Sequence, residues 1–418
     1  MPELQHIPGT FDVLPPASGR WERLIAEFAR VATSAGYGLL ITPTFEELSV
    51  FQRVGASTDV VRKEMYDFVD KGDRHVALRP EVTASAVRAF VQHHPATPWK
   101  VWYAASNFRY EKPQAGRYRE FHQVGIEALG TPDADLDVEV VALGWEYYRA
   151  LGLRRVELLL NSLGDDVCRP GYRALLLAFL AARRGELCEE HQARLEENPL
   201  RALDCKKPQC QKATAGAPRQ IDHLCAPCTR HLARTRAGLD ALGIPYRIDT
   251  ALVRGLDYYT RTTFEYAGLA LESAQNALGG GGRYDGLVAE MGGPDTPGIG
   301  FALGLERILL ALDAESVPAG PGGRLDAYVV DFAGGDAARD LSAELRAAGL
   351  RADRAFDGRS PKSQFKSADR SGAALALVVG PDEAAGGTVA IKDLRGSTPQ
   401  VTVARAEVVE EVRRRVGV

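Results

Sequence analysis

The chain has 418 residues, of which 45% are hydrophobic and 25% are charged, proportions typical of globular domains with a sizeable core. They exclude a disordered chain, a collagen and a coiled coil. A formal net charge of −4 argues against a polybasic protein that coats nucleic acid, but it leaves local basic patches open.

At about 150 residues per domain, this length predicts two to three domains. No apolar run reaches the ~18 residues that a membrane span needs. The N-terminus lacks the basic start and apolar core of a secretory signal. Six cysteines are too few for a disulfide scaffold, so we expect reduced thiols in a cytoplasmic protein without membrane contact.

The first part of the chain mixes helical and strand patterns. Residues 21–31 carry apolar side chains at the spacing of an amphipathic helix. A buried strand is predicted over 37–42. Residues 100–109 and 121–128 have strand patterns on either side of the charged loop 110–120, which indicates a long antiparallel hairpin.

Residues 165–240 are rich in Arg, Leu and Ala and hold all six cysteines, which predicts an inserted helical module. Strands resume at 245–249 and 262–266. The glycine-rich segment 279–286 is predicted to be a flexible turn that lets a ligand approach the backbone closely. Residues 297–312 have the pattern of a strand that leads directly into an amphipathic helix.

The Pro- and Gly-rich segment 317–324 predicts a linker. Beyond it, strand patterns alternate with helical ones. The strands are predicted at 327–331, 374–380 and 388–392, and a helix at 336–348. This alternation predicts a separate C-terminal domain with a mostly parallel sheet.

The hairpin has the densest set of functional side chains. Even spacing places Phe121, Gln123 and Glu127 on one face of its second strand. Four basic residues precede them: Arg109, Lys112, Arg117 and Arg119. Guanidinium groups bind phosphate, a ring stacks on a base and a carboxylate binds a cationic group, so the set suits a nucleotide pocket. The alternative is a solvated hairpin face.

Three single residues are further candidates. Glu81 opens a helix, where an acid also interacts favourably with the helix dipole without any ligand. Arg254 lies at a turn between two strands and can reach into a cleft, although a plain turn is the alternative. Arg307 lies in the first turn of a helix, where a cation opposes the dipole and a bound anion would offset that cost. Its alternative is an ordinary surface arginine.

Taken in order, these segments resemble the three signature motifs of class II aminoacyl-tRNA synthetases. The motifs are the helix and strand ending at Pro43, the hairpin 108–127 and the strand–helix 298–307. The segments 252–259 and 279–285 resemble two further motifs of the histidyl-tRNA synthetases. The tail is similar to the anticodon-binding domain of that family.

The resemblance implies an α+β catalytic domain over residues 1–322, with an antiparallel sheet flanked by helices and the helical insertion at about 165–240. It implies an α/β anticodon-binding domain over residues 325–418. Histidine–tRNA ligation is the implied reaction, by way of histidyl-adenylate and pyrophosphate. The implied substrates and partners are ATP with Mg²⁺, L-histidine, tRNA(His) and a second copy of the chain, contacted through the first motif.

The resemblance also implies residue roles. Arg109 and Arg254 would be catalytic. Histidine would be bound by Glu81, Thr83, Arg109, Gln123, Glu127, Arg254, Tyr258 and Tyr259. ATP would be bound by Arg109, Glu111, Phe121, Arg254 and Arg307. The loop arginines Arg117 and Arg119 would meet ATP or the acceptor end of the tRNA.

Two other functions compete with this one. A non-catalytic paralogue that binds histidine as a regulatory subunit of the histidine-biosynthetic phosphoribosyltransferase is expected to lose both the Arg254 motif and the tail. A related synthetase for proline, threonine or glycine is not expected to carry the segment 254–259. The chain retains all of these features, which favours the histidine ligase.

The tail offers a basic stripe for tRNA. Arg359, Lys362, Lys366 and Arg370 recur at spacings of three, four and four residues, which places them along one helix face suited to phosphate contacts. Of these, Lys362 and Lys366 are the predicted tRNA-binding residues. The alternative is a solvated helix face.

The cysteines predict a metal. Cys205-x₄-Cys210 and Cys225-x₂-Cys228 are separated by fourteen residues, a pattern that matches a structural Cys₄ zinc site. Such a zinc ion would stabilise the insertion near the tRNA acceptor stem, remote from the site of the reaction. The alternative is four buried thiols packing a helical module, since the synthetases that this chain resembles need no metal there.

Other side chains in the insertion could substitute for one of these ligands. Cys188, His191 and His223 are such candidates. Cys168 is interpreted as an ordinary half-buried thiol.

Overall fold

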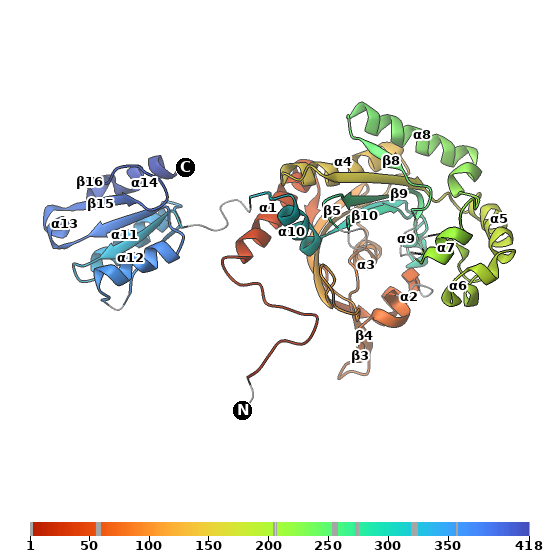
Figure 1. The fold of residues 1–418 in the computed structure, drawn as a ribbon, viewed down its shortest axis with the longest axis horizontal. Coiled ribbons are helices and arrows are strands. Elements are labelled where there is room, and N and C mark those ends of the chain that lie inside the picture. Colours follow the sequence, from red (N-terminus) through yellow and green to blue (C-terminus); the bar gives the residue numbers. More distant parts are fainter. Residues whose placement is uncertain are drawn as a thin grey trace. The chain divides into compact units, whose positions relative to one another are not determined.

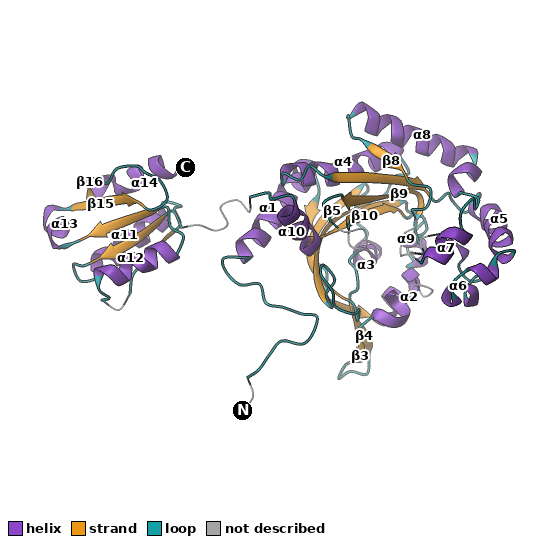
Figure 2. Cartoon of the chain, viewed as in Figure 1, coloured by secondary structure: helices purple, strands orange, loops and turns teal. Residues whose placement is uncertain are grey.

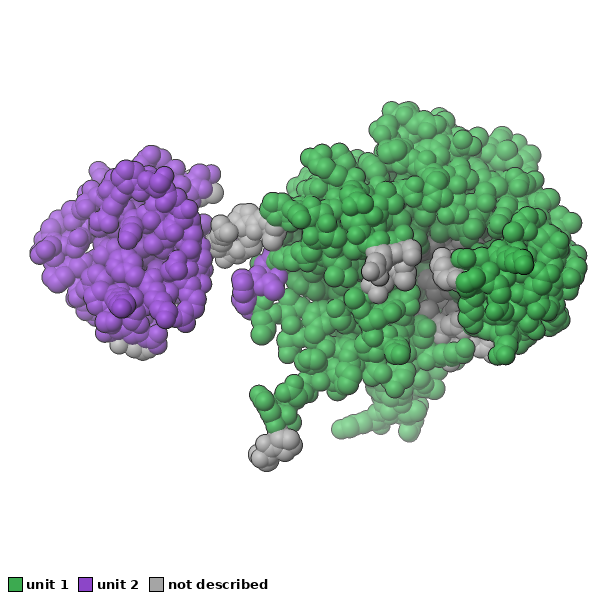
Figure 3. Space-filling model, in the orientation of Figure 1, with its two compact units in different colours: residues 1–14, 20–319 green, residues 15–19, 320–418 purple. Residues whose placement is uncertain are grey.

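The computed structural model describes residues 3–55, 60–203, 205, 207–252, 258–271, 276–318, 325–356 and 358–417. The predicted catalytic residue Arg254 and most of the predicted linker lie outside these ranges. The chain divides into two compact units, one of residues 1–14 and 20–319 and one of residues 15–19 and 320–418 (Figure 3). None of the described helices is both long and apolar enough to cross a membrane.

An eight-stranded sheet forms the frame of the first unit (Figure 1). In spatial order its strands are β1 (Gly38–Leu39), β5 (Trp99–Phe108), β6 (Glu120–Leu129), β11 (Gly298–Gly304), β10 (Ala277–Arg283), β9 (Thr260–Gly268), β7 (Val156–Ser162) and β8 (Tyr246–Ile248). Neighbours from β5 to β7 run antiparallel, whereas the two short edge strands run parallel to theirs. The expected antiparallel sheet is therefore confirmed.

The predicted hairpin is β5 and β6, paired without interruption from Trp99 opposite Leu129 to Phe108 opposite Glu120. The buried strand predicted over 37–42 is shorter than expected, because only Gly38–Leu39 pairs with β5, and both of these residues are exposed.

One face of the sheet carries the main core. Four helices pack on it: α1 (Ser18–Ser34), α4 (Ala134–Ala150), α8 (Ala226–Ala241) and α10 (Leu305–Ala314). Phe28 of α1 lies edge-on to Tyr147 of α4 and Phe301 of β11, with ring centroids 5.1 and 6.0 Å apart. Since side chains alternate along a strand, the neighbouring residues of β6 and β11 face the other side. That second face is free for chemistry.

Smaller elements lie near the second face. A second apolar cluster joins α2 (Leu48–Gly55), α3 (Thr83–His93) and α9 (Leu287–Glu290). A three-stranded antiparallel sheet has the order β2 (Phe45–Glu47), β4 (His75–Leu78), β3 (Asp67–Val69), and a π-helical turn covers Val60–Glu64.

The segment between β7 and β8 contains helices and no strand in its described part, as predicted (Figure 2). Its elements are α5 (Arg169–Ala181), η2 (Arg184–Glu186), α6 (Glu189–Ala193), η3 (Pro199–Ala202), α7 (Pro208–Ala213), η4 (Gln220–His223) and α8. Most of them share an apolar core of their own.

A buried ionic cluster attaches α8 to the rest of the unit. Asp137 of α4 accepts a 2.6 Å hydrogen bond from His231 of α8 and further bonds from the guanidinium of Arg283 on β10. Burial would raise the pKa of Asp137, but these two partners lower it below its usual value. Three elements that are distant in the sequence are joined at one carboxylate.

The second unit has a five-stranded sheet of order β13 (Ala352–Arg354), β12 (Ala327–Asp331), β14 (Leu375–Val379), β15 (Thr388–Asp393), β16 (Val401–Ala404). Its helices are α11 (Asp336–Ala347), α12 (Pro361–Arg370), α13 (Pro381–Gly386), the turn η5 (Arg405–Glu407) and α14 (Val408–Val416). The predicted strands and helix are confirmed. The expectation of a mostly parallel sheet was only half right, because the β14–β15 and β15–β16 pairs are antiparallel.

The prediction of a flexible turn at 279–286 was wrong, because most of that segment is strand β10. A Cβ on Gly281 would lie 1.9 Å from the carbonyl oxygen of Gly300 and 2.7 Å from the Cα of Phe301. Glycine is therefore required for close backbone approach within the sheet rather than for a turn.

We predict that Gly281→Ala destabilises the protein by about 3 kcal/mol or more, because the new methyl would collide with the backbone of β11 and no rotamer change can relieve the collision. Thermal unfolding of the full chain measures the loss. Gly171→Ala in α5 is the matched control, since nothing lies within 4 Å of its Cβ position, and it should gain about 0.5–1 kcal/mol from lower backbone entropy. Equal melting temperatures for the two variants would contradict the crowded-strand interpretation.

Candidate active site

A cavity of about 330 Å³ opens on the second face of the large sheet, beside the β5–β6 hairpin. Six of the predicted site residues line it: Arg109, Glu111, Arg117, Phe121, Gln123 and Arg307. They come from the hairpin and from the first turn of α10. The chain thus gathers three guanidinium groups, an aromatic ring and an amide around one hollow.

Arg109 follows β5 directly and is held from two sides. Its Nε donates a 3.0 Å hydrogen bond to the carbonyl of Pro80, and its guanidinium lies 5.0 Å from the ring centroid of Phe121. Within the described residues, its two Nη atoms have no hydrogen-bond partner. The fork is therefore oriented and available for a bidentate anion.

Arg307 is fixed by backbone oxygens from two other elements. Its Nε donates to Gly116 at 3.2 Å and its Nη1 to Ala277 at 2.7 Å. Burial and the neighbouring guanidinium of Arg117 lower its pKa. Crowding positive charge at a helix N-terminus costs free energy that a polyanion in the cavity would recover.

The hairpin loop carries the other predicted residues. Arg117 pairs with Glu111 at 3.4 Å. Arg119 stacks over Tyr110, 4.2 Å from its ring centroid, and does not belong to the described lining of the cavity. The structure therefore brings Glu111 and Arg117 to the cavity and places Arg119 against Tyr110 instead.

Two buried carboxylates lie deeper on the same sheet face. Glu127 is fully buried and accepts hydrogen bonds from the hydroxyls of Thr83, at 2.8 Å, and Tyr284. Glu81 accepts from the backbone N–H groups of Thr83 and Ala84, at 2.7 and 2.8 Å. Thr83 therefore connects the two acids, and Glu81 caps the first turn of α3.

Burial dominates the protonation of both acids. It raises the pKa of Glu127 to about 8, against the lowering effect of its hydroxyl donors. The pKa of Glu81 is raised as well, mainly by burial. A cationic ligand beside Glu127 would stabilise its ionised form, so the pocket is suited to a small molecule with a protonated nitrogen.

Glycines make room for this arrangement. Gly300 lies opposite Glu127 in the β6–β11 register, and a Cβ there would lie 1.9 Å from the Glu127 carboxylate. A Cβ on Gly125 would lie 2.3 Å from the hydroxyl oxygen of Tyr103. In the Gly-x-Gly pattern before Arg307, Gly300 thus makes room for the Glu127 carboxylate, and Gly298 makes room for the ring of Tyr284.

The remaining predicted residues lie beside these acids. The side chain of Gln123 accepts a 2.9 Å hydrogen bond from Asn107. Tyr258 and Tyr259 are both buried, with ring centroids 4.6 Å apart, and Tyr258 also packs on Tyr284. Among the described residues, Asn107 Oδ1 is buried without a hydrogen-bond partner, and a polar group of a ligand could satisfy it.

Sequence reasoning missed several members of the site: Tyr103, Asn107, Glu265 and Tyr284. Alternation along the strands could have found the first three, because they share a sheet face with Gln123 and Glu127. Arg79 was also missed. It is buried and donates to backbone carbonyls of Thr42, Pro43 and Ser106, which ties the first motif to the hairpin.

The predicted Cys₄ zinc site was wrong in its ligand set. Cys205 and Cys210 lie in one cluster, with Cys188 and His191. The second cluster contains Cys225 and Cys228 together with Asp165 and Cys168. The spacing predicts that the two cysteine pairs share one metal ion. In the folded insertion, each pair instead lies beside two other potential ligands that come earlier in the chain.

A family model described as histidyl-tRNA synthetase matches residues 9–308, and one described as an anticodon binding domain matches residues 326–415. A histidine–tRNA ligase of Moorella thermoacetica is 48% identical over 95% of each chain, and one of Mycolicibacterium vanbaalenii is 49% identical over 98% of this chain and 97% of the relative. The chain belongs to the histidyl-tRNA synthetase family.

Solved structures agree with this membership. The apo histidyl-tRNA synthetase of S. aureus is 35% identical, covers 98% of this chain and 100% of its own, and superposes with a TM-score of 0.81. An ATP phosphoribosyltransferase regulatory subunit/histidyl-tRNA synthetase of Bacillus halodurans is 21% identical with a TM-score of 0.64, a likeness of fold alone.

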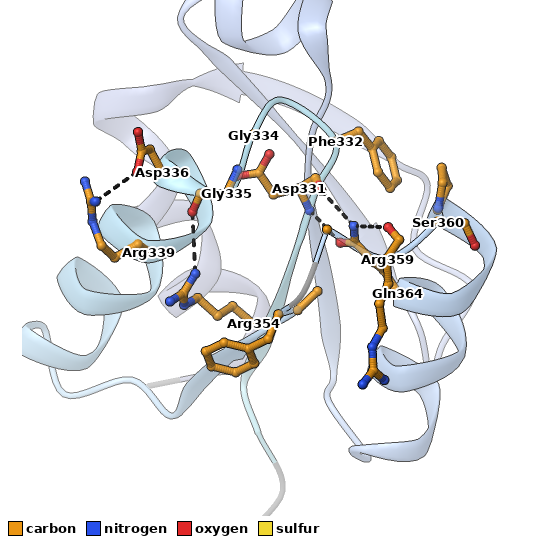
Figure 4. Close-up of a pocket in the computed structure, with 14 residues that line it drawn as sticks. Asp331, Phe332, Gly334, Gly335, Asp336, Arg339, Arg354, Arg359, Ser360 and Gln364 are labelled. Carbon is orange, nitrogen blue, oxygen red and sulfur yellow. Dashed lines mark hydrogen bonds and ion pairs between the residues drawn. The ribbon is translucent and has the colours of Figure 1, made fainter.

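In the second unit of this histidyl-tRNA synthetase family member, a cavity of about 700 Å³ lies where β12 ends and α11 and α12 begin (Figure 4). Gln364 fixes its wall by donating to the carbonyls of Asp331 and Arg359. The predicted Lys362 and Lys366 are exposed on the nearby helix α12. Three further basic side chains, those of Arg339, Arg354 and Arg359, line the cavity itself.

We predict that Glu127→Gln stabilises the unliganded protein increasingly as pH rises. A carboxyl whose pKa is raised to about 8 in the folded state contributes stability below its unfolded pKa, and that contribution is lost as pH rises through the folded value. Glutamine cannot ionise, so the Tm difference, variant minus parent, should grow between about pH 5 and about pH 9. Glu410→Gln, at an exposed position of α14, is the control. A constant difference at Glu127 would contradict the assignment.

Proposed function

We propose that this chain is a histidine–tRNA ligase, which activates L-histidine with ATP and transfers it to the 3′-terminal adenosine of tRNA(His). One observation carries the proposal: Phe121, Gln123 and Glu127 project from a single face of β6. The cavity suited to a nucleotide and the buried pocket suited to a cation therefore lie side by side on that face. The names of the relatives support the same substrates.

Histidine is assigned to the buried part of this face of β6, around Glu127. Glu127 and Tyr259 contact the imidazole ring, and Tyr258 closes the pocket. The α-amino group is bound by Glu81, Thr83 and Gln123. Because these polar groups are buried, an amino acid lacking the ring nitrogens would leave them unpaired, a strong basis for discrimination.

ATP is assigned to the cavity. Phe121 stacks on adenine, Arg109 holds the α-phosphate together with the histidine carboxylate, and Arg307 holds the γ-phosphate. Glu111, in the hairpin loop, also binds ATP, and Arg254 contacts the α-phosphate. Mg²⁺ would enter with ATP, and the cavity-lining carboxylates of Glu111 and Glu265 are oxygen donors of the kind it takes. It would neutralise charge on the phosphates.

The histidine carboxylate attacks the α-phosphorus in line, and pyrophosphate leaves. The terminal ribose hydroxyl of the tRNA then attacks the carbonyl carbon of the mixed anhydride, and AMP leaves. The residues contribute orientation and preorganised positive charge, so no nucleophilic side chain takes part.

The finer architecture belongs to the same proposal. Residues 1–322 form the catalytic domain and 325–418 the anticodon-binding domain. Arg117, Arg119, Lys362 and Lys366 contact tRNA. Two copies pair through the first motif, where the apolar side chains of Leu39 and Ile41 are 56 and 84% exposed, and the dimer works in the cytoplasm.

Pyrophosphate exchange into ATP, measured with each amino acid in turn, tests the proposal. Exchange with histidine alone is expected. Exchange with proline but not histidine would overturn the substrate assignment. No exchange with any amino acid would favour the regulatory paralogue.

We predict that Arg254→Ala slows the exchange reaction ~10²–10³-fold, since one preorganised donor at a developing charge contributes that much, while histidine binding changes only a few-fold. Arg254→Lys should rescue poorly, because an ammonium lacks the planar fork. Arg247→Ala, an exposed arginine on β8, is the matched control. A near-normal rate in Arg254→Ala would show that Arg109 and the metal suffice.

A second prediction concerns the tail. The double variant Lys362→Ala/Lys366→Ala should raise the KM for tRNA about tenfold, the cost of losing charge-assisted phosphate contacts, and leave pyrophosphate exchange unchanged. Arg414→Ala, on α14 of the same unit, should leave both reactions unchanged. Unaltered aminoacylation in the double variant would make the stripe a merely solvated face.

A further inference from the structure

The six cysteines of the chain are divided equally between two compact clusters in the insertion. Each cluster has a fourth member that is a good metal ligand, His191 in the first and Asp165 in the second. Within each cluster the four potential ligand atoms all lie within 4.8 Å of one another.

The first cluster combines Cys188-x₂-His191 with Cys205-x₄-Cys210. The Nδ1 atom of His191 lies 3.0 Å from the sulfur of Cys188 and 3.9 Å from that of Cys210. The backbone N–H of Cys188 donates to the Cys210 sulfur at 3.2 Å. Cys188 and Cys210 are buried, so the cluster is closed on the side of the insertion core.

The second cluster combines Asp165-x₂-Cys168 with Cys225-x₂-Cys228. One carboxylate oxygen of Asp165, Oδ1, lies 3.5 Å from the sulfur of Cys168 and 3.5 Å from that of Cys225. Cys168 and Cys225 occupy the N-caps of α5 and α8, where the helix dipole stabilises a thiolate.

These separations fit a tetrahedral metal. With bonds of about 2.0–2.3 Å from zinc to nitrogen, oxygen or sulfur, neighbouring ligand atoms lie about 3.3–3.8 Å apart. Two short-spaced pairs converging from different helical turns are the usual construction of a structural zinc site. Simple packing of thiols does not account for the histidine nitrogen and the carboxylate that face the sulfurs.

We propose that the insertion binds two structural Zn²⁺ ions, one at Cys188, His191, Cys205 and Cys210 and one at Asp165, Cys168, Cys225 and Cys228. Four protein ligands complete each tetrahedron, so neither ion has an open position for catalysis. Each ion displaces three thiol protons when it binds, which leaves net charges of −1 at the first site and −2 at the second.

The second site is placed to support the active site. Arg261, at the start of β9, pairs with Asp165 at 3.5 Å and lies where it offsets the negative charge. Arg169, next to Cys168, donates to the carbonyl of Tyr259 at 3.1 Å. Zinc at this site therefore fastens the strand start that carries Tyr259, an effect on histidine binding that rests on the proposed function.

Metal analysis of the full chain, purified without chelator, tests the proposal directly. Two zinc ions per chain are expected. Cys210→Ser or His191→Ala should remove only the first ion, and Cys228→Ser or Asp165→Asn only the second. His223→Ala and Asp166→Asn are matched controls, changing the same residue types nearby, and should retain two.

Unfolding the parent protein in the presence of a chromogenic zinc indicator gives the same count without relying on any variant. Fewer than two zinc ions in this assay, or iron with visible charge-transfer absorption, would overturn the proposal. Co²⁺ exchanged into the parent should show the intense bands of tetrahedral thiolate coordination, and octahedral bands would also overturn it.

The effect on the active site has a separate readout. Loss of the second ion should raise the KM for histidine in pyrophosphate exchange several-fold more than loss of the first ion does. Because the zinc count needs no activity, a chain that failed to activate histidine would refute the proposed function and leave the metal result intact. Equal KM values in both sets of variants would refute the link to Tyr259.

Discussion

The sheet of the first unit buries the Glu127 carboxylate at its centre, and no cation from the described part of the chain pairs with it. Among the described residues, the carboxylate is met only by hydroxyls, from Thr83, Tyr284 and Tyr103, and burial raises its pKa to about 8. Asp137 is just as buried, yet its pKa is lowered, because Arg283 and His231 offset the burial. The same physics thus separates a carboxylate that holds the fold together from one that is ready for a charged ligand.

The buried carboxylate of Glu127 restricts which residues can occupy the neighbouring positions of the sheet. Gly300 across the β6–β11 ladder has no space for a Cβ, and the apolar side chains of both strands are turned to the opposite face, where they pack on α1, α4 and α10. One face is therefore filled by aromatic and aliphatic side chains, and the other is cleared by glycines. The guanidinium groups of Arg109 and Arg307 enter the cleared face from the hairpin and the helix that border it.

Much of this could be predicted from the sequence, because it depends on local periodicity. The hairpin, the strand–helix before Arg307 and the alternation of Phe121, Gln123 and Glu127 follow from spacing alone. What failed depends on contacts between distant segments. Four glycines in a row are typical of a turn, and only their pairing with the neighbouring strands β9 and β11 shows that they form part of a sheet. In the same way, no spacing rule connects Asp165 and Cys168 with a cysteine pair almost sixty residues later.

The insertion is joined to the sheet by contacts of different strength, and the weaker contact lies at the second cysteine cluster. The His231–Asp137–Arg283 cluster is buried, and breaking a buried ion pair costs about 3–5 kcal/mol, so α8 is held firmly. Near the active site the tie is weaker: Arg261 and Asp165 are 22 and 17% exposed, and a partly solvated pair contributes only about 1 kcal/mol. An ion bound by Asp165 and three thiolates would fix that carboxylate from its other side. Added rigidity would therefore have its largest effect at the contact between the insertion and β9, next to Tyr259. Half of the cysteines of the chain lie at this contact.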